Sequence, residues 1–182
     1  LRSLVGSEMC IRDRVIGSPT NEKIKIAGKI DVSGHRSLTP SGTIIVRGRS
    51  VTHNGKIFAR GGTGGKVNII SKDTLKLDGS IFAQGTKEKG GSVLFLSEKS
   101  ISSTPKTVVD VSGANKGGRI RSLAKTTNIS SGTFKSNSEG GKGGNIDLTG
   151  DRVEISNAKI EAAGNLMGCL LYTSPSPRDF EA

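Results

Sequence analysis

Aromatic residues are scarce in this sequence of 182 residues, which contains five phenylalanines, one tyrosine and no tryptophan. Proteins that bind single-stranded nucleic acid rely on such rings for stacking, and no other nucleic-acid-binding motif is present. No apolar run approaches the length of a transmembrane helix. We therefore expect neither a specific nucleic-acid partner nor a transmembrane segment.

Metal ligands and catalytic groups are also few. The two cysteines lie near the chain ends, and His35 and His53 fall in polar segments that read as turns, without partners at metal-ligand spacing. The positions after the glycine pairs lack the recurring aspartate that calcium-binding repeats need. We therefore predict no metal, no cofactor and no catalytic residue.

The two ends of the sequence differ from its middle. Residues 4–13 (LVGSEMCIRD) and 170–178 (LLYTSPSPR) can be encoded by complementary strands of one oligonucleotide, read in different frames. Two unrelated natural segments are not expected to have this relation, and both resemble translated adapters from sequencing-library preparation. Such segments are excluded from fold reasoning. We therefore expect 1–14 and 169–182 to be artefacts without a fold, and 15–168 to be a fragment of a longer protein.

Acidic residues are in the minority, because 27 lysines and arginines face 16 aspartates and glutamates, a net charge of +11. Taken together, residues 1–14 and 169–182 contain as many basic as acidic residues, so the excess positive charge belongs to residues 15–168. The basic residues are scattered, without a run of five or more. This pattern is typical of a solvated basic surface, and a specific anion site is the alternative.

Glycine, in contrast, is abundant and periodic. Glycine pairs end at Gly65, Gly91, Gly118 and Gly144, so that the second glycines are 26, 27 and 26 residues apart. A fixed period of this length predicts a solenoid, in which each repeat buries its apolar face against its neighbours. We place the glycines at corners, where a positive φ or a tight bend is needed.

Each repeat contains three strand-like segments. The first alternates between apolar and other residues, which predicts a strand with one buried face. Its two predicted inward columns are Ile44, Val67, Val93, Ile120 and Ile146, and Val46, Ile69, Phe95, Ser122 and Leu148. The third segment has the inward columns Ile30, Ile57, Ile81, Val109, Phe134 and Ile160, and Val32, Ala59, Ala83, Val111, Ser136 and Ala162. A less regular middle segment is marked by Val51, Leu75, Leu77, Ile101, Ile129, Val153 and Ile155. Three strands per coil of about 26 residues predict an all-β, single-stranded parallel β-helix.

A family resemblance rests on this rhythm of a glycine pair, two strands and a small-residue strand. Residues 64–85 (GGKVNIISKDTLKLDGSIFAQG) and 143–164 (GGNIDLTGDRVEISNAKIEAAG) resemble the filamentous haemagglutinin-type exoproteins of two-partner secretion systems. The resemblance implies a right-handed β-helix stalk that is exported through an outer-membrane β-barrel partner and is secreted or displayed at the cell surface as an adhesin. Its receptor would be a glycan or protein on a host or cell surface. The secretion domain of the family is not identifiable here, so the export route follows from the repeats alone.

Two other functions remain open. Carbohydrate-active enzymes, namely polysaccharide lyases and hydrolases, also use parallel β-helices, and they need clustered carboxylates on one outer face. Asp110, Lys135 and Glu161 share one outward column, and Arg121 and Asp147 share another. We interpret both sets as opposite-charge ladders between stacked strands, and we therefore expect no enzyme. The second alternative is the stalk of a contact-dependent toxin.

One pair of aromatic residues gives a candidate binding site. Phe58 and Phe82 align in the outward column of the third strand. Either a loop such as 86–89 covers them, because large apolar side chains usually find shelter, or they form a contact surface. In the second case sugar rings stack on the phenylalanines, and Lys56, Arg60 and Lys87 attract sulfate or carboxylate groups of a glycan.

Overall fold

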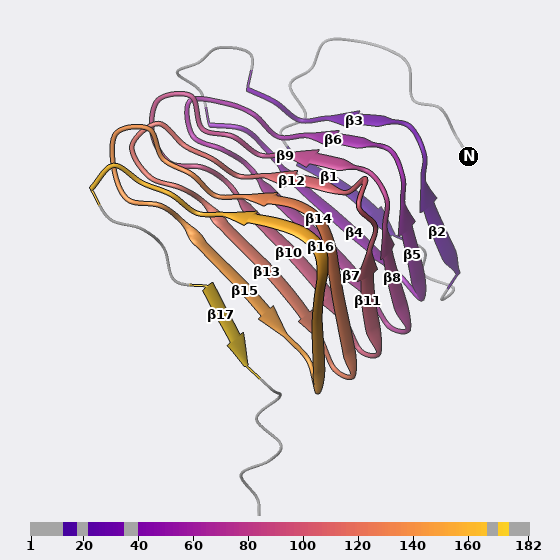
Figure 1. Ribbon diagram of the computed structural model, residues 1–182. Helices are drawn as coiled ribbons and strands as arrows, with labels where there is room; N and C mark the ends of the chain where they lie inside the picture. Colours follow the sequence, from indigo (N-terminus) through magenta and orange to yellow (C-terminus); the bar gives the residue numbers. More distant parts are fainter. Residues whose placement is uncertain (1–12, 18–21, 35–39, 167–170, 175–182) are drawn as a thin grey trace, which may run out of the picture.

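The chain winds into a parallel β-solenoid of about five turns, seen in a computed structural model (Figure 1). The structure describes residues 13–17, 22–34, 40–166 and 171–174. These ranges contain seventeen strands and no helix, and all strand pairs are parallel. The predicted all-β parallel β-helix is confirmed.

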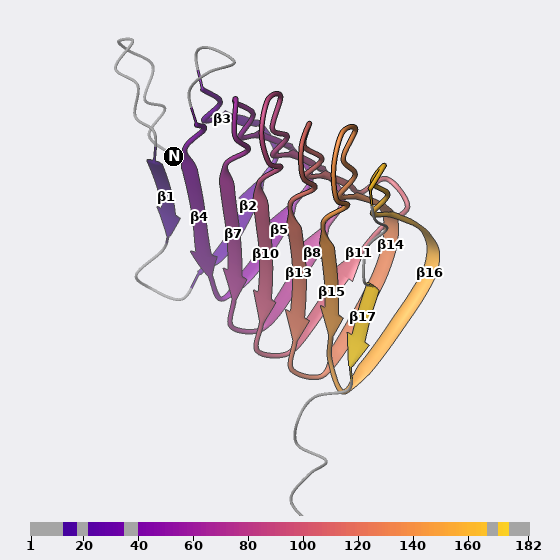
Figure 2. The same ribbon diagram turned by 90° about the vertical axis from the view of Figure 1, so that its left-hand side faces the viewer.

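The first of three faces is a seven-stranded sheet, whose strands lie side by side in Figure 2. In spatial order they are β1 (Asp13–Gly17), β4 (Thr43–Gly48), β7 (Lys66–Ser71), β10 (Ser92–Ser97), β13 (Arg119–Ala124), β15 (Asn145–Thr149) and β17 (Leu171–Ser174).

The second and third faces share one sheet, because two long strands bend from one face into the other. The second face contains β2 (Lys23–Ile26), β5 (Ser50–His53), β8 (Thr74–Leu77) and β11 (Ser100–Ser103), and the third contains β3 (Lys29–Asp31), β6 (Lys56–Phe58), β9 (Ser80–Phe82) and β12 (Val108–Asp110). The strands β14 (Thr127–Lys135) and β16 (Arg152–Glu161) continue both faces.

The buried columns confirm the predicted register of the first and third strands. The ten residues predicted to point inward from the first face are all buried, and none is more than 3% exposed. On the third face Ile57, Ile81, Val109 and Phe134 are buried, whereas Ile30 and Ile160 are partly covered because they lie on the outermost strands. One continuous aliphatic core therefore runs through the stack, and its burial is the main favourable term in the fold.

The middle strand carries a polar residue inside at one coil. Ile129 marks this strand in the sequence, but the register places Asn128 opposite Ile101 and Val153, and Asn128 is fully buried. The Asn128 amide donates to the carbonyls of Ser122 (2.7 Å) and Thr149 (3.2 Å) and accepts from the Ser122 hydroxyl (3.1 Å). A buried side-chain amide is tolerated when it is hydrogen-bonded in this way. The strand therefore keeps its alternation of inward and outward side chains with a polar residue at an inward position.

His53 also lies elsewhere than expected, since it is the last residue of β5 and is fully buried rather than in a polar turn. It stacks on Leu77 of the next coil. Neither ring nitrogen has an aligned hydrogen-bond partner. Burial lowers the pKa of His53 from 6.5 to about 4, against a small opposing effect of the Ser80 backbone. His35 lies outside the described residues.

The glycine pairs are required by close contact between coils. A Cβ at Gly91 would lie 2.2 Å from the carbonyl oxygen of Gly65, and one at Gly118 would lie 2.1 Å from that of Gly91. Among the described glycines only Gly132 has a positive φ, of 95°. The expected positive φ therefore does not account for the glycine pairs, whereas close approach between coils, which was not predicted from the sequence, does.

The segments expected to lack a fold are in part strands. Asp13 and Arg14 belong to β1, which pairs with β4, and residues 171–174 form β17, which pairs with β15. These two pairings extend the first sheet at both ends of the stack. Each end strand of a parallel stack presents unpaired backbone groups, and an adjoining extended segment can satisfy them.

We predict that Gly91→Ala destabilises the solenoid by about 1–3 kcal/mol or more, because its methyl group collides with backbone that cannot move aside. Gly28→Ala is the matched control, since a Cβ there meets nothing within 4 Å. Urea denaturation followed by circular dichroism measures both variants. Equal midpoints for Gly91→Ala and the wild type would contradict the close-contact explanation.

A second prediction concerns acid stability. Between pH 6.5 and about 4 the unfolded chain binds a proton at His53 that the folded chain excludes, so the free energy of unfolding falls as the pH is lowered through this range. The loss from this residue is roughly 3 kcal/mol in total. In His53→Leu this pH dependence should largely disappear in urea titrations from pH 4 to 7, and an unchanged profile would show that the ring is hydrated.

Candidate functional site

The described structure offers two candidate sites, the predicted aromatic pair on the third face and a groove along the glycine corner. The aromatic pair is formed by Phe58 of β6 and Phe82 of β9, which are register partners on adjacent coils. Their ring centroids are 5.4 Å apart and the rings are inclined by 13°, so they stack on each other. The predicted alignment is therefore confirmed, and one face of each ring is already used by the other.

Two cations lie over these rings. The guanidinium carbon of Arg60 is 5.0 Å from the centroid of Phe58 and 4.6 Å from that of Phe82, and the Lys29 ammonium is 5.0 Å from Phe58. The Nε of Arg60 is buried without a hydrogen-bond partner, which indicates that the guanidinium packs on the rings as a flat group. We name Lys29, Phe58, Arg60 and Phe82 the aromatic cluster.

The loop 86–89 packs against the preceding corner. The backbone amide of Thr86 donates to the carbonyl of Gly61 (2.9 Å), and those of Lys87 and Glu88 donate to Gly62 (3.1 and 3.0 Å). Lys87 is exposed in this loop, and Lys56 is exposed on β6. Of the five predicted glycan-contact residues, the structure thus brings Phe58, Phe82 and Arg60 together, with Lys56 on the same strand as Phe58.

Carboxylates stand at both ends of the aromatic pair. Asp31 is the register partner of Phe58, and Asp110 is that of Phe82. Burial raises the pKa of Asp31, but hydrogen bonds from Ser33 and the Lys29 ammonium at 3.2 Å outweigh it, so the pKa lies below its ordinary value. Two carboxyl groups beside the rings disfavour an acidic glycan at this place. Glycan contact through these five residues stays a prediction.

Elsewhere on the surface, charges of opposite sign alternate between coils. Asp73 binds Lys99 (2.7 Å) and Arg49 (2.8 Å), and these two cations hold its pKa below its ordinary value. The predicted ladders are present in Arg121 with Asp147 and Lys135 with Glu161, both at 3.4 Å. Asp110 departs from its ladder, since it accepts from the Gln84 amide at 2.6 Å. Among the described residues, no group of three or more potential metal ligands comes together.

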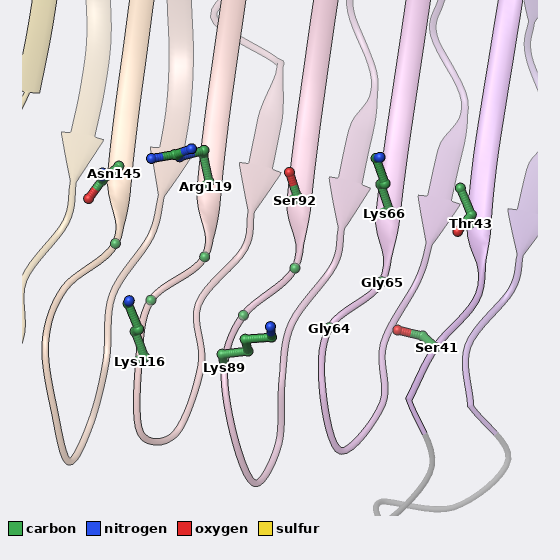
Figure 3. A pocket seen from close by; sticks show the side chains of 15 residues that line it. Ser41, Thr43, Gly64, Gly65, Lys66, Lys89, Ser92, Lys116, Arg119 and Asn145 are labelled. Atoms are coloured by element: carbon green, nitrogen blue, oxygen red, sulfur yellow. The ribbon is translucent and has the colours of Figure 1, made fainter.

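A groove of about 450 Å³ runs along the glycine corner (Figure 3). Its floor is formed by successive glycine pairs, whose close contact leaves no room for side chains. Cationic side chains of Lys66, Lys89, Lys116 and Arg119 line it, and we name it the glycine-corner groove.

The register places these cations in two rows. Lys89 and Lys116 pair through an isolated bridge on one side of the glycines, and Lys66, Ser92 and Arg119 are successive partners on the other. Neighbouring coils are roughly 4.8 Å apart, as paired strands are. The groove lining contains no carboxylate, and within the described part of the chain none of the four cations forms a salt bridge.

Sequence reasoning missed this groove, because it assigned the glycines to corners and regarded the basic residues as scattered. A signal was present in the fixed offset from the glycine pairs. Lysine immediately precedes the pair at Lys89, Lys116 and Lys142, and a basic residue immediately follows it at Lys66 and Arg119.

Comparison with protein-family models, curated proteins and solved structures finds no match. The haemagglutinin-type family is therefore supported by the resemblance of the repeats alone. The described residues contain no helix that is long and apolar enough to cross a membrane.

We predict that the aromatic cluster stabilises the third face. In a double-mutant cycle, Phe82→Leu and Arg60→Met should couple by about 0.5–2 kcal/mol, because the guanidinium packs on the ring. Phe82→Leu combined with Lys56→Met is the control, and it should show no coupling. Urea denaturation gives the four free energies of each cycle, and additivity in both cycles would rule out the cation–ring contact.

Proposed function

We propose that this chain is a structural and adhesive stalk segment of a secreted or surface-displayed bacterial adhesin of the haemagglutinin type. The observation that carries the proposal is the regular stack, in which the strands of each coil meet the same strands of the next coil in an almost constant register. A structure that grows by identical steps suits a spacer, since its length is set by the number of coils.

The hydrogen bonds between coils support a mechanical role for the segment. Backbone hydrogen bonds join every coil to the next on all three faces, and further bonds continue through the corners, as from Gly91 to Ala83 within a coil and from Ser92 to Gly65 between coils. Salt bridges such as Arg121 with Asp147 add contacts along the axis. Each is worth little at an exposed surface, so the backbone ladder and the core supply most of the cohesion.

The outward carboxylates favour a stalk over a polysaccharide lyase or hydrolase. Such an enzyme needs carboxylates directed at a substrate, with spacing set by the reaction. Glu161 binds Lys159 and Lys135, and these cations hold its pKa below its ordinary value, while Asp147 binds Arg121. We therefore propose that the segment has no enzymatic activity. A toxin stalk would use the same coils and differs only in what it carries.

Export is the testable part of this proposal. If the family assignment is correct, the complete gene encodes a secretion domain before these coils, and a neighbouring gene encodes an outer-membrane β-barrel transporter. Deleting that barrel gene in the source bacterium should abolish surface display of the protein, measured with antibodies raised against residues 15–168. Intact cells with equal labelling before and after the deletion would refute the export route.

In the same strain, in-frame removal of residues 66–118 joins Gly65 to Arg119 and keeps the register of the coils, because Lys66, Ser92 and Arg119 are stacked partners. The shortened protein should still be displayed if the coils are a stalk. A catalytic domain encoded downstream of the coils would instead assign the segment to a toxin.

A further inference from the structure

The glycine-corner groove departs from the charge pattern of the rest of the surface. At three other places on the surface a cation meets a carboxylate on the next coil, namely at Asp73 with Arg49 and Lys99, at Arg121 with Asp147 and at Lys135 with Glu161. Beside the glycine pairs, Lys89, Lys116 and Lys142 follow one another as direct partners on successive coils. Like charges at facing positions of paired strands destabilise a sheet, so this column of three lysines has an electrostatic cost.

The opposite side of the groove adds positive charge. Lys66 and Arg119 point outward at the start of β7 and β13, one coil on either side of Ser92. Figure 3 shows the side chains of both rows beside the glycine floor. Four cations thus border an open channel of about 450 Å³ whose lining contains no carboxylate. The potential of such a channel attracts an anion, and its length along the stack suits an extended chain rather than a single small ion.

We propose that the glycine-corner groove binds a strand of carboxylated or sulfated polysaccharide along the solenoid axis. The glycine floor lets a chain lie close to the backbone. Lys89 and Lys116 can meet acidic groups one coil apart, roughly 4.8 Å, and Lys66 and Arg119 can meet groups two coils apart, roughly 9.6 Å. Thr43 and Ser92 lie on either side of Lys66 in the same row, and their hydroxyl groups can bond to the hydroxyl groups of the sugars. The inference identifies a ligand for the proposed adhesive role.

The chemistry of the lining favours a polysaccharide over single-stranded nucleic acid. No aromatic residue lines the groove, so bases have no ring on which to stack. Three of the four cations are lysines, which act as point charges and give attraction without the bidentate geometry that arginine offers to phosphate. The aromatic cluster lies on the third face between two carboxylates and is a separate feature.

The test measures binding of the full 182-residue chain to immobilised polygalacturonate and dextran sulfate, with neutral dextran and single-stranded DNA as comparators. Lys89→Gln/Lys116→Gln/Arg119→Gln removes three groove cations. The matched control, Lys76→Gln/Lys106→Gln/Lys125→Gln, removes three exposed cations elsewhere and gives the same net charge.

We expect the groove variant to lose about tenfold or more in affinity for both acidic polysaccharides and to show a weaker dependence on salt, because fewer ions are released on binding. The control variant should stay within about twofold of the wild type. Equal losses in the two variants would overturn the proposal, since binding would then depend on net charge alone. Binding of neutral dextran, or tighter binding of single-stranded DNA, would overturn the assigned ligand class.

A single substitution keeps the test valid if the triple variant fails to fold. Ser92→Glu places a carboxylate between Lys66 and Arg119 in one row of the groove, and Ser102→Glu places one outward on β11 of the second face. Only the first should weaken polysaccharide binding, and equal binding by both variants would again contradict the site. The test is separate from that of export, because loss of display in the barrel deletion and loss of binding in the groove variants are measured independently.

Discussion

The approach of one coil to the next at the glycine corner is the constraint on which the rest of the structure depends. The backbone of Gly91 lies so close to Gly65, and that of Gly118 so close to Gly91, that a methyl group has no space at either position. Because the coils approach closely at this corner, each coil lies one strand spacing from the previous one. The backbone ladders of all three faces can then form in register. The aliphatic columns then stack without gaps, as a close-packed core requires.

Most of this fold could be predicted from the sequence because the same alternation of apolar residues and the same glycine spacing recur in several coils. The alternation around Ile44, Val67, Val93, Ile120 and Ile146 is consistent in five coils, so one ambiguous residue does not change the register. The sequence gives no inward column for the middle strand, where a single coil departs from the repeat. Ile129 is the more apolar residue, yet Asn128 points inward, because its amide can reach carbonyl groups at a corner that no periodicity describes.

His53 and the chain ends show a second limit of sequence reasoning. His53 was assigned to a turn from the polar residues beside it, but the ladder carries it into the core opposite Leu77. Burial and strand pairing are imposed by the neighbouring coil, and local composition does not report them. The same effect applies to β1 and β17, whose backbone groups pair with the end strands β4 and β15 of the stack.

Repetition has opposite consequences inside and outside the solenoid. Inside, stacking like on like is favourable, because aliphatic side chains pack on their copies. Outside, stacking like on like is favourable only for neutral groups, such as the rings of Phe58 and Phe82, and is unfavourable for charges. Some outward columns resolve this by alternating sign, as Lys135 and Glu161 do. The column of Lys89, Lys116 and Lys142 keeps its like charges beside a glycine floor that has no structural need for cations. The anionic chain that we propose for the groove would offset the repulsion within this column, and it would link the repeat that builds the solenoid to the surface that the solenoid presents.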